Sequence, residues 1–329
     1  MNKNTKKMVG VFTFTIICLF LIMSCSNSGN ETDITTKEND FTPPSGKSTD
    51  TKISGYGPWN TRILIATSTD GLTWTRTNTI LSDQADVPDA ILDSSEKLFV
   101  YYITWAKEVR NKIVVAISED SGKTWSYKKT SVDTQSSWAS PVDPDVVLLE
   151  DGIIRMYFTS DPNDGSGPRT YSATSSDGVT FTMDSGTRFA KSGSMVLDPT
   201  VLKIGETWNY YAGGISQDKN YHATSTDGIT FTEQNYISFS DGFKMGNGIK
   251  KADGKYWYYG FEGGMPTVSF HPSIKAVEST DGVTWTSIDN SKFSVDTSGG
   301  LETDFVKDPA IVQVADGTYL LFYVTEIPK

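Results

Sequence analysis

Ser68-Thr69-Asp70-Gly71-Leu72-Thr73-Trp74 is the first of five copies of one short motif, and this repetition decides the fold. The other copies are Ser118-Glu119-Asp120-Ser121-Gly122-Lys123-Thr124-Trp125, Ser175-Ser176-Asp177-Gly178-Val179-Thr180-Phe181, Ser225-Thr226-Asp227-Gly228-Ile229-Thr230-Phe231 and Ser279-Thr280-Asp281-Gly282-Val283-Thr284-Trp285. Their aspartates are 50, 57, 50 and 54 residues apart, close to the roughly 50-residue unit of a four-stranded propeller blade. Between these turns the chain is rich in Thr, Tyr, Trp, Val and Ile, which favour strands. The sequence therefore predicts an all-β repeat protein.

A second repeat places the remaining strands. The copies are Asp143-Pro144-Asp145-Val146-Val147, Asp198-Pro199-Thr200-Val201-Leu202 and Asp308-Pro309-Ala310-Ile311-Val312, with weaker ones at Val87-Pro88-Asp89-Ala90-Ile91 and Met245-Gly246-Asn247-Gly248-Ile249. Each leads through a turn into an aromatic-rich strand, such as Leu98 to Tyr102 or Tyr256 to Tyr259. Each blade is thus expected to begin with strand A at the second repeat, continue with aromatic strand B, and end with strands C and D around the Asp-Gly hairpin.

The two ends of the chain predict how the ring closes. Residues 62–79 form a C–D hairpin with no A or B strand before it, and residues 308–326 form an A–B hairpin with nothing after it. We therefore expect a five-bladed β-propeller of four-stranded antiparallel blades, with the last blade closed by the N- and C-terminal segments; such closure limits exposed edges. A stacked β-solenoid would need shorter repeats and capping units, and the sequence has neither.

The first 25 residues predict export. Lys3, Lys6 and Lys7 precede an apolar run from Val9 to Met23, which is too short for a comfortable membrane span but suits a secretion signal. The ending Ser24-Cys25 resembles a bacterial lipoprotein signal sequence, in which the cysteine becomes the acylated first residue. An ordinary signal peptide with an incidental cysteine is the alternative. The expectation is a lipoprotein anchored on the outer membrane, the cell surface or the periplasmic face.

Composition sets the remaining boundaries. Residues 26–55 are polar and almost free of large apolar side chains, which predicts a disordered tether. The expected organisation is a signal peptide at 1–24, a tether at 25–55 and a propeller at 56–329. The net charge of −11 becomes −14 without the three signal lysines, which argues against nucleic-acid binding. Cys18 lies in the signal, so the mature chain cannot form an internal disulfide. A monomer is expected, and the membrane is expected to be contacted only through the lipid.

The Ser-x-Asp-Gly-x-Thr-Trp motif resembles the Asp-box of sialidases and other β-propellers. Its aspartate can accept hydrogen bonds from turn amides, its glycine can supply a positive φ, and its aromatic residue can pack between blades. Because all five hairpins lie on one face of the predicted ring, this structural interpretation is favoured over metal or sugar binding. The starts of the A strands and the B–C loops then meet on the opposite face, where propellers usually have their central pocket.

Carboxylates collect on that opposite face. They are Asp86, Asp89, Asp143, Asp145, Asp198 and Asp308 at the starts of the A strands, with Asp161, Glu262 and Glu326 at the ends of the B strands. Five blades that begin with Asp-Pro and end with the hairpin motif resemble the five-bladed propeller glycosidases, the arabinanase, xylosidase, invertase and levansucrase superfamily. The resemblance covers residues 56–329 and implies hydrolysis of glycosidic bonds by two aspartates and a glutamate from the first three blades.

The match to that catalytic set is partial. Asp143 corresponds to the second-blade aspartate, but Val87 stands at the first-blade position, with Asp86 and Asp89 beside it. Asp198 is in the third blade, without the expected glutamate nearby, and Glu262 is in the fourth. The predicted catalytic residues are therefore Asp89, Asp143, Asp198 and Glu262, since one carboxyl group must donate a proton while another attacks or activates water.

The predicted substrate is an oligo- or polysaccharide. The residues expected to contact it are Asp86, Asp145, Trp105, Trp138, Arg169, His271 and Asp308. Two alternatives remain: a non-catalytic glycan- or protein-binding propeller, and an exo-sialidase, which would need several arginines around one carboxylate while the chain has only six. With two histidines and no metal-ligand motif, no cofactor is predicted; Ca²⁺ would suit the top-face oxygens, but no ligand loop specifies it. The Asp-Pro aspartates also have a plain interpretation as caps of the turns between blades.

Overall fold

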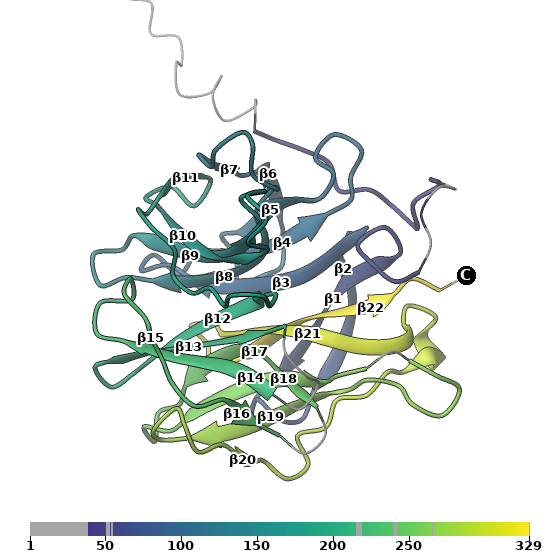
Figure 1. The fold of residues 1–329 in the computed structure, drawn as a ribbon. Coiled ribbons are helices and arrows are strands. Elements are labelled where there is room, and N and C mark those ends of the chain that lie inside the picture. Colours follow the sequence, from purple (N-terminus) through teal and green to yellow (C-terminus); the bar gives the residue numbers. More distant parts are fainter. Residues whose placement is uncertain are drawn as a thin grey trace, which may run out of the picture. The chain divides into compact units, whose positions relative to one another are not determined.

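Five antiparallel sheets follow one another around a common axis in the computed structural model, as Figure 1 shows, which confirms the predicted five-bladed β-propeller. The structure describes residues 39–50, 53, 55–214, 219–239, 242–264 and 266–328. The innermost strands β3, β8, β12, β17 and β21 contact one another in that order, and β21 contacts β3. These strands therefore line the axis, and the ring is closed.

The blades have the predicted strand order. The first is built from β3 (Ala85–Leu92), β4 (Leu98–Thr104), β5 (Lys112–Ser118) and β6 (Ser126–Lys129). The second is built from β8 (Val142–Leu148), β9 (Ile154–Ser160), β10 (Arg169–Ser175) and β11 (Thr180–Met183), and β7 (Ser131–Val132) joins its edge in parallel. The third is built from β12 (Leu197–Ile204), β13 (Thr207–Gly213), β14 (Lys219–Ser225) and β15 (Thr232–Glu233), with β16 (Ile237–Ser238) also on β14.

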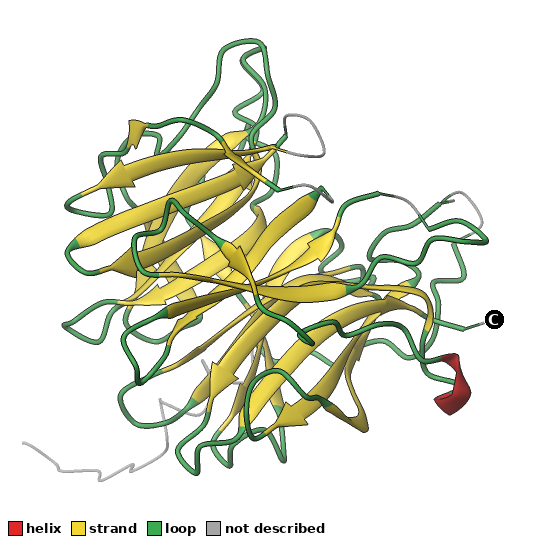
Figure 2. Cartoon of the chain, turned by 90° about the horizontal axis from the view of Figure 1, so that it is seen from below, coloured by secondary structure: helices red, strands yellow, loops and turns green. Residues whose placement is uncertain are grey.

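The last two blades complete the ring. The fourth is built from β17 (Phe243–Lys250), β18 (Tyr256–Glu262), β19 (Ile274–Ser279) and β20 (Thr286–Ser287). The fifth combines β21 (Thr303–Gln313) and β22 (Tyr319–Glu326) with β1 (Thr61–Ser68) and β2 (Thr75–Asp83). A 3₁₀ turn, η1 (Thr297–Gly299), precedes β21, and Figure 2 shows it as the helical turn beside a structure otherwise made of strands and loops.

The fifth blade joins segments from the two ends of the described chain. Strand β1 pairs with β22 along its whole length, and Ile63 lies opposite Val324. An ion pair between buried Glu302 and half-buried Arg76 also crosses this junction: the Arg76 Nε atom lies 2.5 Å from Glu302 Oε1, and the Arg76 Nη2 atom lies 3.0 Å from Glu302 Oε2. The hydroxyl of Tyr323 donates to the same glutamate at 2.6 Å. The predicted closure is therefore confirmed, and a satisfied charge pair reinforces it.

The five repeat turns, each centred on the aspartate of the sequence motif, have a common geometry that the third blade illustrates. Asp227 Oδ1 accepts hydrogen bonds from the amides of Ile229 and Thr230, both at 2.8 Å, and from the hydroxyl of Ser225 at 2.7 Å. Gly228 adopts a φ of 69°, which a residue with a Cβ atom rarely adopts. The motif therefore builds the turn itself.

Tyrosines lock these turns to the preceding blade. The Tyr157 hydroxyl donates to the Gly228 carbonyl at 2.8 Å, and its ring meets Phe231 edge-on at 6.2 Å. The other such pairs are Tyr101 with Gly178, Tyr211 with Gly282 and Tyr259 with Gly71. At the fifth junction Phe322 takes the tyrosine's place and packs edge-on against Trp125. The motif's aromatic residues thus lie between blades.

We expect Asp227→Ala to destabilise the propeller by about 1–2 kcal/mol, because two turn amides lose their acceptor. Chemical denaturation measures this change, with Glu206→Ala, an exposed carboxylate in the β12–β13 turn, as the control. Equal stabilities of the two variants would contradict the structural role. So would a variant of unchanged melting temperature that had lost ligand binding.

The segment Asn39–Asp50, which the sequence analysis places within the tether, lies with the propeller. The amide of Phe41 donates to the Tyr127 carbonyl at 3.3 Å, so this segment extends the edge of the first blade beyond β6. Further along, Lys47 forms a 2.9 Å ion pair with Glu326. The predicted signal peptide, Cys25 and residues up to 38 lie outside the described residues. In the described part of the chain, no helix is long and apolar enough to span a membrane.

Candidate functional site

A β-bulge near the start of each innermost strand positions the site. One extra residue interrupts the pairing at Asp86/Asp89, Val142/Asp145, Leu197/Thr200, Met245/Asn247 and Lys307/Ala310. In four blades a residue within this bulge is left-handed, with φ of 48° at Val87, 53° at Asp143, 51° at Asp198 and 44° at Asp308. A bulge breaks the alternation of side chains and re-aims one of them. The repeated bulge therefore delivers one side chain per blade to the channel mouth.

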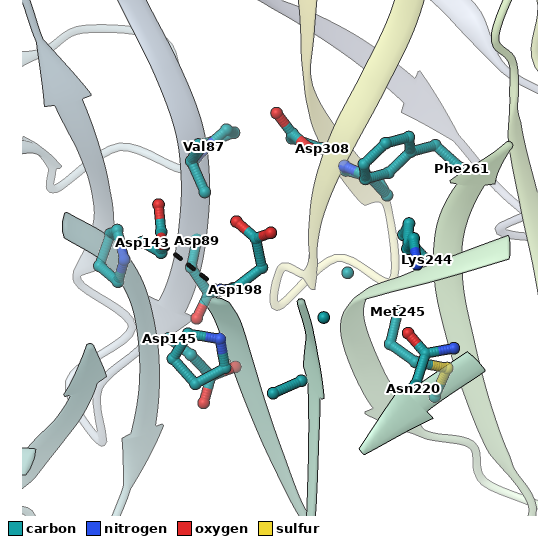
Figure 3. Close-up of a pocket in the computed structure, with 17 residues that line it drawn as sticks. Val87, Asp89, Asp143, Asp145, Asp198, Asn220, Lys244, Met245, Phe261 and Asp308 are labelled. Carbon is teal, nitrogen blue, oxygen red and sulfur yellow. Dashed lines mark hydrogen bonds between the residues drawn. The ribbon is translucent and has the colours of Figure 1, made fainter. Parts of the chain in front are cut away.

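Those side chains form a ring around a cavity of about 50 Å³, shown in Figure 3. In blade order the ring residues are Val87, Asp143, Asp198, Met245 and Asp308. Lys244, Phe261 and Asn220 also line the cavity. The cavity thus combines the three ring carboxylates, and those of Asp89 and Asp145, with apolar walls, and it has room for a small number of water molecules or one small chemical group.

Asp143 and Asp198 are the closest-linked members of the ring. The Asp198 amide donates to Asp143 Oδ2 at 3.4 Å, which Figure 3 marks with a dashed line. Burial raises the pKa of Asp143 to about 6, and the nearby charges of Asp308 and Asp86 add to the rise. Asp198 is exposed to solvent, and the protein atoms packed around the channel mouth and then repulsion from Asp143 raise its pKa to about 7. Near neutral pH the pair therefore shares protons.

Lys307 pairs with two carboxylates where the fifth and first blades meet in the ring. Its ammonium group contacts Asp308 and lies 2.8 Å from Asp86 Oδ1. That Asp86 oxygen also accepts the Val87 amide at 3.0 Å, so the lysine of the fifth blade fixes the first blade's bulge. Burial raises the pKa of Asp308 to about 7 in spite of this lysine, because Asp86 and Asp198 repel its charge. The ring is thus a coupled set of carboxyl groups.

A polar belt made of Asp89, Asp145 and Asn247 closes the cavity on the side away from the ring. Asp89 Oδ2 accepts the Val146 amide at 2.6 Å, and Asp145 Oδ2 accepts the Val201 amide at 3.0 Å. Asn247 accepts the Ile311 amide at 3.1 Å and donates to Asp89 at 2.5 Å. Each side chain reaches the backbone of the next blade, and burial raises the pKa of Asp89 to about 7. Asp89 and Asp145 therefore form the floor of the cavity and hold blades together.

A larger well of about 630 Å³ lies on the other side of the belt. Its wall is mainly aliphatic, with Ile91, Val147, Leu202, Ile249 and Val312 from the five innermost strands. The three ring carboxylates do not line it. The carboxylates that do line it are Asp145, whose Oδ2 accepts the Val201 amide, and Glu150 and Asp151 in the β8–β9 turn, so the well is the roomier cavity but does not contain the ring.

The structure brings some predicted site residues together and keeps others apart. Asp89, Asp143, Asp145, Asp198 and Asp308 line the cavity. Asp86 is 6% exposed behind the ring. Glu262, at the end of β18, is absent from the lining; Lys275 lies 2.8 Å from one of its oxygens, and Ser273 donates to the other at 2.6 Å.

The remaining predicted contacts lie away from the cavity lining. Trp105 meets Trp59 edge-on at 5.3 Å, and Trp138 packs on Tyr171 at 4.4 Å. Arg169 lies 3.7 Å from Asp164, and a ring nitrogen of His271 lies 2.7 Å from the Asp304 carbonyl. None of the six arginines lines the cavity, so the arrangement lacks the clamp that a sialic acid carboxylate needs.

Two lysines of the site were missed by the sequence analysis. Lys244 and Lys307 each stand one residue before the ring position of their blade, where the second and third blades have Val142 and Leu197. A basic residue at a repeat position where two blades have apolar residues and the first has Asp86 was the available signal. The described residues include no group of three or more His, Cys, Asp or Glu arranged to hold a metal ion.

Comparisons with known proteins agree on the architecture. No protein-family model matches the sequence, and no curated protein matches it either. Among solved structures, a glycosyl hydrolase from Bacteroides ovatus aligns with a TM-score of 0.55 and 20% identity, over 74% of this chain and 82% of that one. An endo-arabinase from Bacteroides thetaiotaomicron aligns with a TM-score of 0.54 and 15% identity, over 74% and 94%.

The chain shares the five-bladed propeller fold of these glycoside hydrolases. Another structure with the fold is an N-acetylgalactosamine deacetylase from F. plautii, solved in complex with blood group B trisaccharide. It aligns with a TM-score of 0.53 and 14% identity, over 70% of this chain and 76% of that one. Because the glycosidase-like propeller fold carries more than one reaction, the reaction has to be argued from the site.

The ring carboxylates also predict how stability depends on pH. An aspartate has a pKa near 3.9 in an unfolded chain, whereas burial raises the pKa of Asp143 to about 6 and that of Asp308 to about 7 here. The folded state then binds more protons between about pH 4 and 7, so stability falls as pH rises through that window. We expect a higher melting temperature at pH 5 than at pH 8, and a flatter profile for Asp143→Asn/Asp198→Asn/Asp308→Asn.

The repeat turns act in the opposite direction at lower pH. Hydrogen bonds from the Thr284 and Val283 amides lower the pKa of Asp281 to about 2. That stabilisation is present above about pH 4 and is lost as pH falls toward 2. Scanning calorimetry across pH 2–9 should therefore give a maximum near pH 4–5. A melting temperature that rose steadily to pH 8 would contradict the assigned burial of the ring.

Proposed function

We propose that this protein binds the end of a carbohydrate chain in the channel mouth and hydrolyses its glycosidic bond with paired carboxyl groups. The observation that carries the proposal is the ring of Asp143, Asp198 and Asp308 around one cavity. Their pKa values, raised to about 6, 7 and 7, leave protonated and ionised members side by side near neutral pH. Glycoside hydrolysis requires one carboxyl group of each kind.

The catalytic assignment is narrower than the one the sequence suggests. Asp143 and Asp198 remain in it, and Asp308 joins them because it completes the same ring. Asp89 accepts two belt hydrogen bonds and would support the floor, and Glu262 is engaged by Lys275 and Ser273. Screening the protein against arabinans, xylans, fructans, mannans and galactans, for both reducing-end release and calorimetric binding, tests the proposal directly.

A non-catalytic glycan-binding propeller is the second candidate. Val87 and Met245 occupy two of the five ring positions, and no glutamate lines the cavity among the described residues. A protein of this kind would bind a glycan in the screen and release no reducing ends. If neither binding nor hydrolysis is seen, the carbohydrate proposal is wrong and a protein partner takes its place.

We also propose that the protein is exported and anchored to a membrane through a lipid on Cys25. The apolar run and the Ser24-Cys25 ending support this. We expect Cys25→Ala to move the protein from the membrane fraction to the soluble fraction without changing its melting temperature, because the propeller unit begins at Asn39. Metabolic labelling with a fatty acid and fractionation measure the change. A Cys25→Ala protein that was still labelled and still sedimented with membranes would overturn the proposal.

A further inference from the structure

Val87 is the exceptional member of the ring. It occupies the position where the second, third and fifth blades present aspartates, and Figure 3 places it beside Asp143 and Asp308. Its φ is 48°, within the left-handed region. Aspartate, asparagine and glycine tolerate that region, whereas a β-branched residue there is strained. The first blade thus carries the residue type least suited to its backbone.

The surrounding structure holds this strain in place. The Val87 amide donates to the Asp86 carboxylate, and the Lys307 Nζ atom, from the fifth blade, lies 2.8 Å from Oδ1 of the same group. Pro88 follows Val87 directly in the chain. A strained residue that its surroundings over-determine marks a functional position. Val87 is only partly buried and lines the cavity, so its side chain is available to a ligand.

The valine gives one sector of a carboxylate-lined cavity an apolar surface. A ligand hydroxyl facing Val87 would give up its water without gaining a hydrogen bond, which is unfavourable. A methyl group in the same place would gain from leaving water, while Asp143 and Asp308 on either side can accept hydrogen bonds from neighbouring hydroxyl or amide groups of the same sugar. The sector is therefore complementary to an apolar group flanked by donors.

We propose that Val87 is a specificity-determining residue that selects a sugar carrying a methyl group, either the C6 methyl of a deoxy sugar or the methyl of an acetyl substituent. This inference rests on the proposed carbohydrate function. It assigns the first blade the role of recognising the methyl group and leaves the reaction to the carboxylates.

Matched sugar pairs test the inference by isothermal titration calorimetry. Methyl α-L-fucoside and methyl α-L-galactoside differ at C6 only in a methyl versus a hydroxymethyl group, and N-acetyl- and N-formylgalactosamine differ only in one methyl group. We expect about tenfold tighter binding of the methyl-bearing member of one pair, the low end of what one such group provides in an apolar pocket. The pair that shows the preference identifies the source of the methyl group.

Two variants complete the test. Val87→Asn should abolish the preference and raise the melting temperature, because asparagine accepts the left-handed backbone. Val87→Ile, which keeps both the strain and the apolar surface, should retain the preference. Sugars bound without a methyl preference, or with the same preference in Val87→Asn, would overturn the inference alone. No binding of any of the four sugars would also overturn the inference, while the glycan screen decides separately whether the carbohydrate proposal stands.

Discussion

Asp143→Asn and Asp198→Asn should each lower glycan hydrolysis by at least about 10²-fold while leaving the propeller as stable as the wild type or more stable. An amide keeps the shape of the side chain but can neither donate a titratable proton nor attack or activate water, and the loss of one positioned acid–base group has an effect of this size. The stability follows from the surroundings of the two groups, since partial burial of Asp143 and the neighbouring carboxylates around Asp198 disfavour their charged forms.

Turnover on the glycan identified by the screen, followed as reducing-end release, measures this prediction. Glu206→Gln, an exposed carboxylate on the β12–β13 turn, should leave turnover unchanged and serves as the matched control. Two variants with wild-type turnover would show that the ring is not catalytic. Unchanged glycan affinity in both would further show that the ligand does not meet the ring at all.

Glu302→Gln should destabilise the propeller by about 2 kcal/mol, or roughly 4–8 °C in melting temperature, the effect of weakening several hydrogen bonds to a half-buried charged group. Arg76 contacts both carboxylate oxygens, and the Tyr323 hydroxyl and the Asp296 amide donate to them as well. A glutamine can accept through one atom only, so the guanidinium loses both its charge partner and its two-pronged contact.

A surface ion pair provides the comparison for this second prediction. Glu150 lies 3.1 Å from Lys203, but its side chain is 93% exposed, so Glu150→Gln should cost less than about 1 kcal/mol. Denaturant midpoints of the two variants, with the slope of each transition, measure the difference. If Glu302→Gln unfolded within 1 kcal/mol of the wild type, the closing blade would owe its stability to strand pairing and packing alone.

The blades could be predicted from the sequence because the residues that form each repeat turn are near neighbours in the chain. The spacing of Ser225, Asp227 and Gly228 specifies a turn whose hydrogen bonds are all within a few residues. The N-terminal boundary of the propeller was harder to predict from the sequence. Phe41 is a single aromatic residue in a polar stretch, and its pairing with Tyr127 depends on a strand edge that only the folded blade creates.

The site was harder to predict because its geometry depends on contacts between blades. Asp86, Val87 and Asp89 lie within four residues, and the bulge decides which of them reaches the cavity. The alternation of side chains that guides sequence interpretation is broken at that point. Glu262 lies at a strand end on the predicted face, but Lys275, from the neighbouring strand, pairs with it. Charge partners that come from other strands leave no local signal.

Sharing a blade between the two ends of the chain has a consequence for the order of folding. Ile63 must pair opposite Val324, so the inner edge of the β1–β2 hairpin stays unpaired until β22, which lies far later in the chain, is in place. Until then its inner edge and its buried side chains face water, and the contacts that hide them are the most distant in sequence. Such pairings make folding slow, in the range of milliseconds to seconds for β-rich domains, and expose an unpaired edge meanwhile. The same closure that seals the finished ring therefore leaves any chain in which β22 has not yet paired with β1 with an exposed strand edge, which favours aggregation.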